Sequence, residues 1–123
     1  MSTTPLISII DDDEAVRIAT AALVRALGYE ARAYASAEAF LDSPSAAVSA
    51  CLIVDVQMPG MSGPELQRRL LSETKPPPMI FITAFPDPEV RERVLAMGAI
   101  NVLGKPCDGK VLVHSIETAL SRG

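Results

Sequence analysis

Short apolar runs alternate along the chain with longer segments in which apolar residues recur every three or four positions. The short runs have the length of buried β-strands, and they lie at residues 6–10, 51–54, 79–82 and 100–103. A fifth run, at residues 30–34, alternates polar and apolar side chains, which is typical of a strand at the edge of a sheet. The pattern therefore predicts five strands.

The segments between these runs have the spacing of amphipathic helices. Residues 16–27 place their apolar side chains on one face, and Gly28 is expected to end that helix. Ser36 is expected to cap a short helix that reaches Leu41, and a loop rich in Ser and Ala follows it. Three further helices are predicted from Pro64, from Asp87-Pro88 to Gly98, and from about Asp108 to Leu120.

Five strand–helix units in succession predict an α/β fold, in which a parallel sheet is covered by helices on both faces. The 123 residues form one domain of ordinary size, so residues 1–123 are expected to be a single unit.

The composition is that of a globular protein, with 49% hydrophobic and 21% charged residues. No apolar run approaches the ~18 residues of a membrane span, and the first residues have no signal-peptide pattern, so a cytoplasmic protein without membrane contact is expected. The net charge of −4 and the scattered basic residues argue against direct nucleic-acid binding. One His and two Cys without a Cys-x-x-Cys spacing argue against zinc binding.

Polar residues stand where four of the predicted strands end. Asp11 and Asp12 follow the first strand, and Asp55 follows the third. Thr83 ends the fourth, and Lys105 comes just after the fifth. Because ligands of an open parallel sheet bind at the carboxyl ends of its strands, we expect these side chains to form one site.

Three carboxylates beside one lysine call for a cation. Carboxylates crowded together raise one another's pKa, and Mg²⁺ (or Mn²⁺) prefers oxygen ligands. The predicted metal ligands are the carboxylates of Asp12 and Asp55 and the main-chain carbonyl of Gln57. Asp11 belongs to the same acidic metal site. The side chain of Gln57 is a candidate for tuning hydrolysis.

With the cation bound, the site could hold a phosphoryl group, since phosphoryl transfer depends mainly on positioning and on nearby positive charge. Asp55 is then the predicted nucleophile, which gives an acyl phosphate. Lys105 would contact the phosphoryl oxygens, and the Thr83 hydroxyl would donate a hydrogen bond to one of them. Ala84 is small enough to leave room for the group.

At this point the sequence resembles the receiver domains of bacterial two-component response regulators, from about Leu6 to Leu120. The motifs that carry the resemblance are Ile10-Asp11-Asp12-Asp13, Val54-Asp55-Val56-Gln57-Met58-Pro59-Gly60-Met61-Ser62-Gly63, Ile82-Thr83-Ala84 and Lys105-Pro106. The resemblance implies a sheet of strand order 2-1-3-4-5, a cis bond before Pro106, and phosphoryl transfer from a histidine kinase or phosphotransfer protein. Residues 36–41 resemble the FixJ subfamily.

The resemblance also implies a phosphorelay switch, one that catalyses only its own phosphorylation and slow dephosphorylation. Its changing surface is expected at the fourth helix, fifth strand and fifth helix, near Phe85 and Val102, where a partner binds or a homodimer forms. Val102 stands where receivers often carry a switching aromatic residue, and Cys107 replaces the usual Phe. No effector domain follows the last helix, so either separate partners give the output or the receiver has been excised from a longer protein.

Two alternatives stay open. Asp11-Asp12-Asp13 contains the Asp-x-Asp of haloacid dehalogenase-like phosphohydrolases, which would make Asp11 the nucleophile; Ala15 departs from that pattern, which expects Thr or Val. The other is a receiver that only dimerises and is never phosphorylated. The acidic residues also have a structural reading, because Asp13 or Glu14 could simply cap the next helix.

Overall fold

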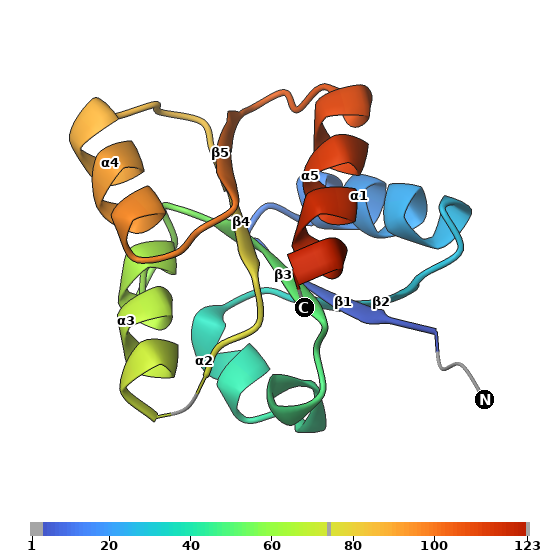
Figure 1. Ribbon diagram of the computed structural model, residues 1–123, viewed down its shortest axis with the longest axis horizontal. Helices are drawn as coiled ribbons and strands as arrows, with labels where there is room; N and C mark the ends of the chain where they lie inside the picture. The colour runs from blue at the N-terminus through green and yellow to red at the C-terminus, as the bar shows by residue number, and fades with distance from the viewer. Residues whose placement is uncertain (1–3, 74, 123) are drawn as a thin grey trace.

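Five parallel strands form the middle layer of the protein, in the order β2-β1-β3-β4-β5 that the resemblance implied. The computed structural model describes residues 4–73 and 75–122, and Figure 1 shows the helices packed around this twisted sheet. The strands are β1 Leu6–Ile10, β2 Glu30–Tyr34, β3 Cys51–Asp55, β4 Met79–Thr83 and β5 Asn101–Gly104. The predicted α/β class is confirmed.

The helices are α1 Glu14–Ala26, α2 Ala37–Leu41, α3 Gly63–Glu73, α4 Pro88–Ala96 and α5 Gly109–Arg122. Ser36 and Asp87 cap α2 and α4 through their side chains, as the sequence predicted. Asp13 caps α1, since its carboxylate accepts the Ala15 and Val16 N–H groups. The structural reading of Asp13 is therefore correct.

Several boundaries differ from the sequence prediction by one or two residues; β5, for example, begins and ends one residue later than the predicted run at 100–103. Asp55 and Thr83 are the last residues of β3 and β4, so both strands are one residue longer than the apolar runs. The segment predicted as a loop after α2 contains a short 3-10 helix, η1, at Pro44–Ala47. Pro44 fixes φ at a helical value in its first turn, and the Tyr34 hydroxyl lies 2.6 Å from Ser45 Oγ, which holds that turn against β2.

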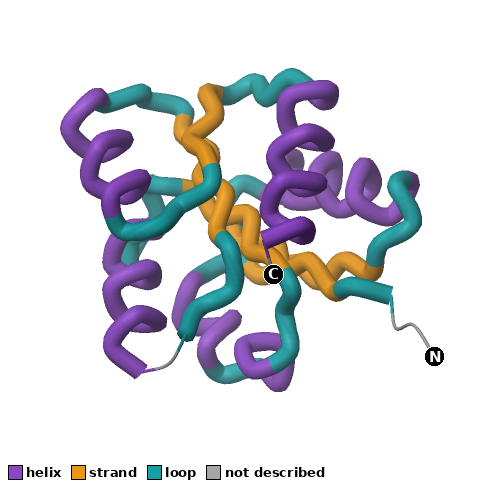
Figure 2. Tube along the Cα trace, viewed as in Figure 1, coloured by secondary structure: helices purple, strands orange, loops and turns teal. Residues whose placement is uncertain are grey.

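Each face of the sheet has its own apolar core. Figure 2 shows the strands as a central layer between two groups of helices. On one face, α1 and α5 bury side chains such as Val24 and Ile116 against β1 and β3. On the other, α2, α3 and α4 bury Phe40, Leu66 and Val94. No helix within 4–73 and 75–122 combines the length and the apolar character that crossing a bilayer requires.

The strand register brings the polar strand ends together. Ile10 of β1 pairs with Val54 of β3, so the residues that follow them, Asp11 and Asp55, lie at the same edge of the sheet. On the other side of β3, Asp55 pairs with Ile82, and Thr83 pairs with Gly104, the residue before Lys105. Parallel pairing thus brings the polar residues at the four strand ends to one edge of the sheet, as the sequence predicted.

Gly63 lets α3 begin directly against the end of β3. A Cβ atom at this position would lie 2.5 Å from the Asp55 carbonyl oxygen and 2.9 Å from the Phe81 ring. The Gly63 N–H donates to the Val56 carbonyl at 3.0 Å, which closes the loop of residues 56–62. The close packing that a glycine allows here, together with this hydrogen bond, brings the two ends of the loop beside Asp55 together.

Gly63→Ala is expected to lower the free energy of unfolding by about 1–3 kcal/mol, because the new methyl group would overlap the Asp55 carbonyl and the Phe81 ring. Urea denaturation measures the change. Gly109→Ala is the matched control, since nothing lies within 4 Å of an added Cβ there. Equal effects of the two substitutions would contradict this account of Gly63.

Candidate functional site

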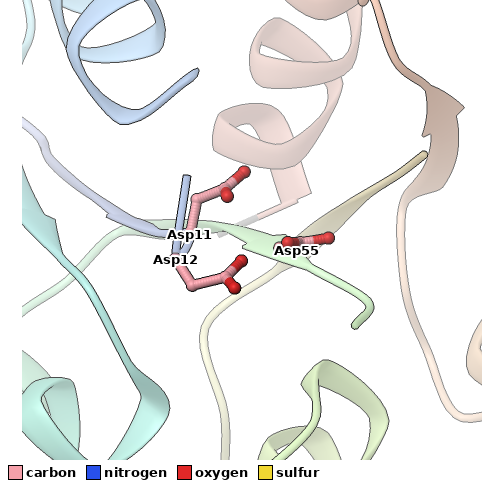
Figure 3. A group of neighbouring side chains, drawn as sticks. All are labelled: Asp11, Asp12 and Asp55. Atoms are coloured by element: carbon pink, nitrogen blue, oxygen red, sulfur yellow. The ribbon is translucent and has the colours of Figure 1, made fainter. Parts of the chain in front are cut away.

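Three carboxylates meet at the carboxyl edge of the sheet. Asp11 and Asp12 leave the end of β1, and Asp55 is the last residue of β3 (Figure 3). One carboxylate oxygen of each lies within 4.8 Å of the others, and the three could hold a metal ion. Asp11 and Asp55 are buried, whereas Asp12 is exposed. The sequence prediction that these residues lie together is correct.

Lys105 bridges the two buried carboxylates. Its ammonium lies 3.1 Å from Asp11 Oδ2 and 3.4 Å from Asp55 Oδ2. Burial lowers the pKa of Lys105, but the hydrogen bonds and charges of Asp11 and Asp55 outweigh it, and the net pKa is raised. The main-chain N–H of Lys105 also donates to the Thr83 carbonyl at 2.8 Å. The Lys105–Pro106 bond is cis, as the resemblance implied.

The pKa of Asp55 is raised from 3.8 to about 6. Burial is the largest cause; repulsion from Asp11 and a side-chain hydrogen bond with Asp12 act in the same direction. Lys105 and the Gln57 N–H, which donates to Asp55 Oδ1 at 3.3 Å, oppose the rise without cancelling it. One lysine therefore does not compensate the three carboxylates, which are left in need of further positive charge.

A divalent cation fits this set of side chains. All three offer carboxylate oxygens, which hard cations prefer. Asp11 Oδ2 is buried and accepts no hydrogen bond of good geometry from the described residues, although the Lys105 ammonium lies 3.1 Å away. An ion or its coordinated water would complete the surroundings of this oxygen.

Thr83 stands on the opposite side of Asp55 from the acidic pair along the strand order. Its buried hydroxyl donates to Gln57 Oε1 at 3.2 Å and accepts the Phe85 N–H at 3.0 Å. A hollow of about 380 Å³ opens where β1, β3, β4 and β5 end. Its lining includes Asp12, Asp55, Gln57, Ala84 and Lys105. Asp55 lines this hollow, and Asp11 does not.

The expected switch surface shows two different environments. The Phe85 side chain is 72% exposed, although its N–H is held by Thr83. Val102 is partly buried in the core beneath α4, and its carbonyl accepts the Arg91 guanidinium at 3.0 Å. Phe85 is therefore an aromatic residue directly linked to the site, whereas Val102 belongs to the packing of α4 on β5.

Two residues that contact the site's backbone were missed by sequence reasoning. The Arg17 guanidinium donates to the Asp11 carbonyl at 2.8 Å and so ties α1 to the acidic turn. Glu38, in α2, accepts the Met61 N–H in the loop after Asp55 at 3.1 Å. An arginine one turn inside α1 could have indicated the first contact, because that turn follows the acidic residues directly. No spacing in the sequence relates Glu38 to Met61.

Comparison with known proteins agrees with this geometry. The family model described as "Response regulator receiver domain" matches residues 7–117. The response regulator protein TmoT of Ectopseudomonas mendocina is 39% identical over 94% of the chain and 52% of its own length. The transcriptional regulatory protein FixJ of Bradyrhizobium diazoefficiens is 32% identical, over 98% of the chain and 58% of its own length.

A response regulator receiver protein from Burkholderia phymatum, known from its crystal structure, superposes with a TM-score of 0.81. It is 40% identical, and 96% of each chain is covered. The chain thus spans only about half the length of the curated relatives it matches, but nearly all of this solved receiver.

The raised pKa of Asp55 predicts how stability depends on pH in the metal-free protein. The folded state binds the Asp55 proton more tightly than the unfolded state, so this stabilisation is present below pH 3.8 and is lost as the pH rises through about 6. Asp55→Asn should therefore raise the melting temperature at about pH 7.5 by about 3–6 °C, and less at about pH 5.

Thermal unfolding in a chelator measures the effect, and saturating Mg²⁺ should shrink it by stabilising the wild type. Asp42→Asn, which removes an exposed carboxylate at the end of α2, is the control. A gain that is equal at both pH values would contradict the proposed crowding of carboxylates.

Proposed function

The chain belongs to the response regulator receiver domain family, and we propose that it is a phosphorylation switch in which Asp55 is the phosphoacceptor. Receiver domains act in phosphorylation-dependent signalling rather than as enzymes on an external substrate. The finer assignments to Asp55, Thr83 and Lys105 are our proposal.

One observation carries this proposal: Asp55 is the carboxylate that both contacts the Lys105 ammonium and lines the open hollow. Asp11 contacts the same ammonium but does not line the hollow, although both carboxylates are buried, at 1% exposed for Asp11 and 4% for Asp55. An incoming phosphoryl group can therefore reach Asp55 through the hollow. This difference favours the receiver reading over a phosphohydrolase that uses Asp11.

In the proposed reaction an Asp55 oxygen attacks the phosphorus of a phosphohistidine. The new O–P bond forms as the N–P bond breaks, and the imidazole of the donor leaves with the electron pair. Lys105 neutralises charge on the phosphoryl oxygens, and the Asp55 carboxylate reacts in its ionised form. Asp12, Asp55 and the Gln57 carbonyl would hold Mg²⁺, which supplies the remaining positive charge.

Thr83 would report the modification. In the unmodified site its hydroxyl proton is given to Gln57, and its oxygen holds the Phe85 N–H. A phosphoryl group on Asp55 adds three strong acceptor oxygens, which would compete with Gln57 for that proton. Rotation of the Thr83 hydroxyl group would then disturb its bond to Phe85 and move the exposed ring.

The whole protein's partners are also a proposal. A histidine kinase or a phosphotransfer protein would supply the phosphoryl group. The output would come from a partner or a second copy at the surface of α4, β5 and α5, which is flanked by the exposed Phe85 in the segment before α4. The absence of an aromatic at Val102 is compatible with this route, because the contact to Thr83 passes through the Phe85 backbone.

Beryllofluoride, a mimic of the phosphoryl group, tests the proposal when it is added with Mg²⁺ to the wild type. The expected result is a set of amide NMR shifts centred on Asp55, Thr83 and Lys105, with Phe85 shifted as well. No change at these residues would end the proposal.

Covalent labelling by a small phosphodonor separates the phosphoacceptor from the alternatives. Asp55→Asn is expected to abolish labelling with Mg²⁺, because Asn is not a nucleophile toward phosphorus. Asp11→Asn should slow labelling but keep the label on Asp55, as mass spectrometry of the peptides would reveal. In the wild type or in Asp55→Asn, label on Asp11 would instead favour the phosphohydrolase, and an unlabelled wild type would favour the module that only dimerises.

Gln57→Ala is expected to release the Thr83 hydroxyl in the unmodified protein. The amide resonances of Thr83 and Phe85 should then move part of the way toward their positions in the beryllofluoride complex. Gln57→Glu keeps an acceptor for the Thr83 proton and should leave both resonances near their wild-type positions. Identical spectra for Gln57→Ala and the wild type would contradict a role for this hydrogen bond.

A further inference from the structure

The loop of residues 56–62 has to keep its shape if it is to serve the site. It begins directly after Asp55 and carries Gln57, whose carbonyl is a proposed metal ligand and whose side chain accepts the Thr83 proton. At its far end the Glu65 N–H donates to Ser62 Oγ at 3.2 Å, and the Ser62 N–H donates to Glu65 Oε1 at 3.0 Å. This reciprocal cap fixes the loop where α3 begins.

The middle of the loop is held from a different element, α2. Glu38 Oε2 accepts the Met61 N–H at 3.1 Å. The same oxygen lies 2.6 Å from where a Cβ of Gly60 would be, so the carboxylate occupies the space that a side chain would need. Gly60 also has φ of +76°, a conformation that favours glycine. The turn at residues 60–61 and the Glu38 carboxylate thus fit each other.

Neighbouring contacts keep α2 in register with the loop. Phe40 and Ala37 of α2 are fully buried in the core that also contains Met58 of the loop. Ser36 Oγ accepts the Ala39 N–H at 3.0 Å and so caps the N-terminus of this short helix. Glu38 therefore projects from a short helix whose own position is fixed by burial, and it can transmit that position to Met61.

From this geometry we propose that Glu38 is a positioning residue for the site. Its carboxylate holds the Gly60-Met61 turn, and through that turn it holds the Gln57 carbonyl where the cation needs it. The inference rests on the proposed function, because it assigns Glu38 a part in binding the cation at Asp55. It adds α2, the helix on which the resemblance to the FixJ subfamily rests, to the elements that build the site.

The size of the expected effect follows from exposure. Glu38 is exposed, so its bond to Met61 competes with water and should add little to global stability. We expect the hydrogen bond to act mainly by ordering the loop before the cation binds. Removing it should weaken Mg²⁺ binding about three- to tenfold, the factor expected for one net hydrogen bond.

Three variants of the full chain test the proposal. Glu38→Ala removes the acceptor and the charge, Glu38→Gln keeps an acceptor without the charge, and Asp42→Ala removes a charge from the end of the same helix. Two quantities are measured by NMR: the hydrogen-exchange rate of the Met61 amide and the Mg²⁺ dissociation constant. Urea denaturation is followed in parallel.

Glu38→Ala is expected to raise both quantities while the free energy of unfolding stays close to that of the wild type. Glu38→Gln should restore both toward the wild type, and Asp42→Ala should leave both unchanged. A wild-type dissociation constant in Glu38→Ala would overturn the proposal. So would an equal weakening in Glu38→Gln and Glu38→Ala, because the charge rather than the hydrogen bond would then be responsible.

The design separates this inference from the proposed function. A wild type that binds no Mg²⁺ and takes no label on Asp55 would end the proposed function, together with the role of Glu38 toward the cation. If the wild type binds Mg²⁺ and is labelled while Glu38→Ala behaves identically in every measurement, the function stands and only the inference about Glu38 fails.

Discussion

The Lys105 ammonium between the carboxylates of Asp11 and Asp55 is the interaction on which the site depends. With Asp12, these groups carry about three negative charges against one positive charge at neutral pH. The pKa of Asp55 is accordingly raised to about 6, mainly by burial and then by Asp11. A phosphoryl group adds a further charge of about −1.5 to −2. On the proposed function, a divalent cation would offset this excess of negative charge before the phosphoryl group arrives.

This charge imbalance follows from the fold, because the charged residues stand at strand ends that parallel pairing holds next to one another. Parallel pairing of β1 with β3 fixes Asp11 beside Asp55, and pairing of β4 with β5 fixes Thr83 beside the residue before Lys105. Both faces of the sheet are covered, so that Asp11 and Asp55 have little access to water except at the edge. The apolar cores thus determine the electrostatics of the site.

Much of this arrangement could be predicted from the sequence, because it depends on periodicity and on strand ends. The run from Cys51 into Asp55 was readable as a strand that delivers a carboxylate, and Asp11, Thr83 and Lys105 followed by the same reasoning. The strand order 2-1-3-4-5 was implied by the resemblance, whereas the register of neighbouring strands came from the structure. Contacts between a helix and a distant loop were not readable. Glu38 and Met61 are 23 residues apart, and no spacing rule relates them.

The Thr83 hydroxyl shows why the unmodified site is itself a defined state. Its proton goes to Gln57 and its oxygen receives the Phe85 N–H, so one small group is bonded to the loop after β3 and to the segment after β4. Glu38 and the Ser62–Glu65 cap hold that loop at two further points. A new acceptor on Asp55 would have to draw the proton away from a loop that is already fixed. If that loop keeps these contacts when Asp55 carries a phosphoryl group, Thr83 and the exposed Phe85 would be the groups left to move. The proposed change would then run from the site toward the segment after β4.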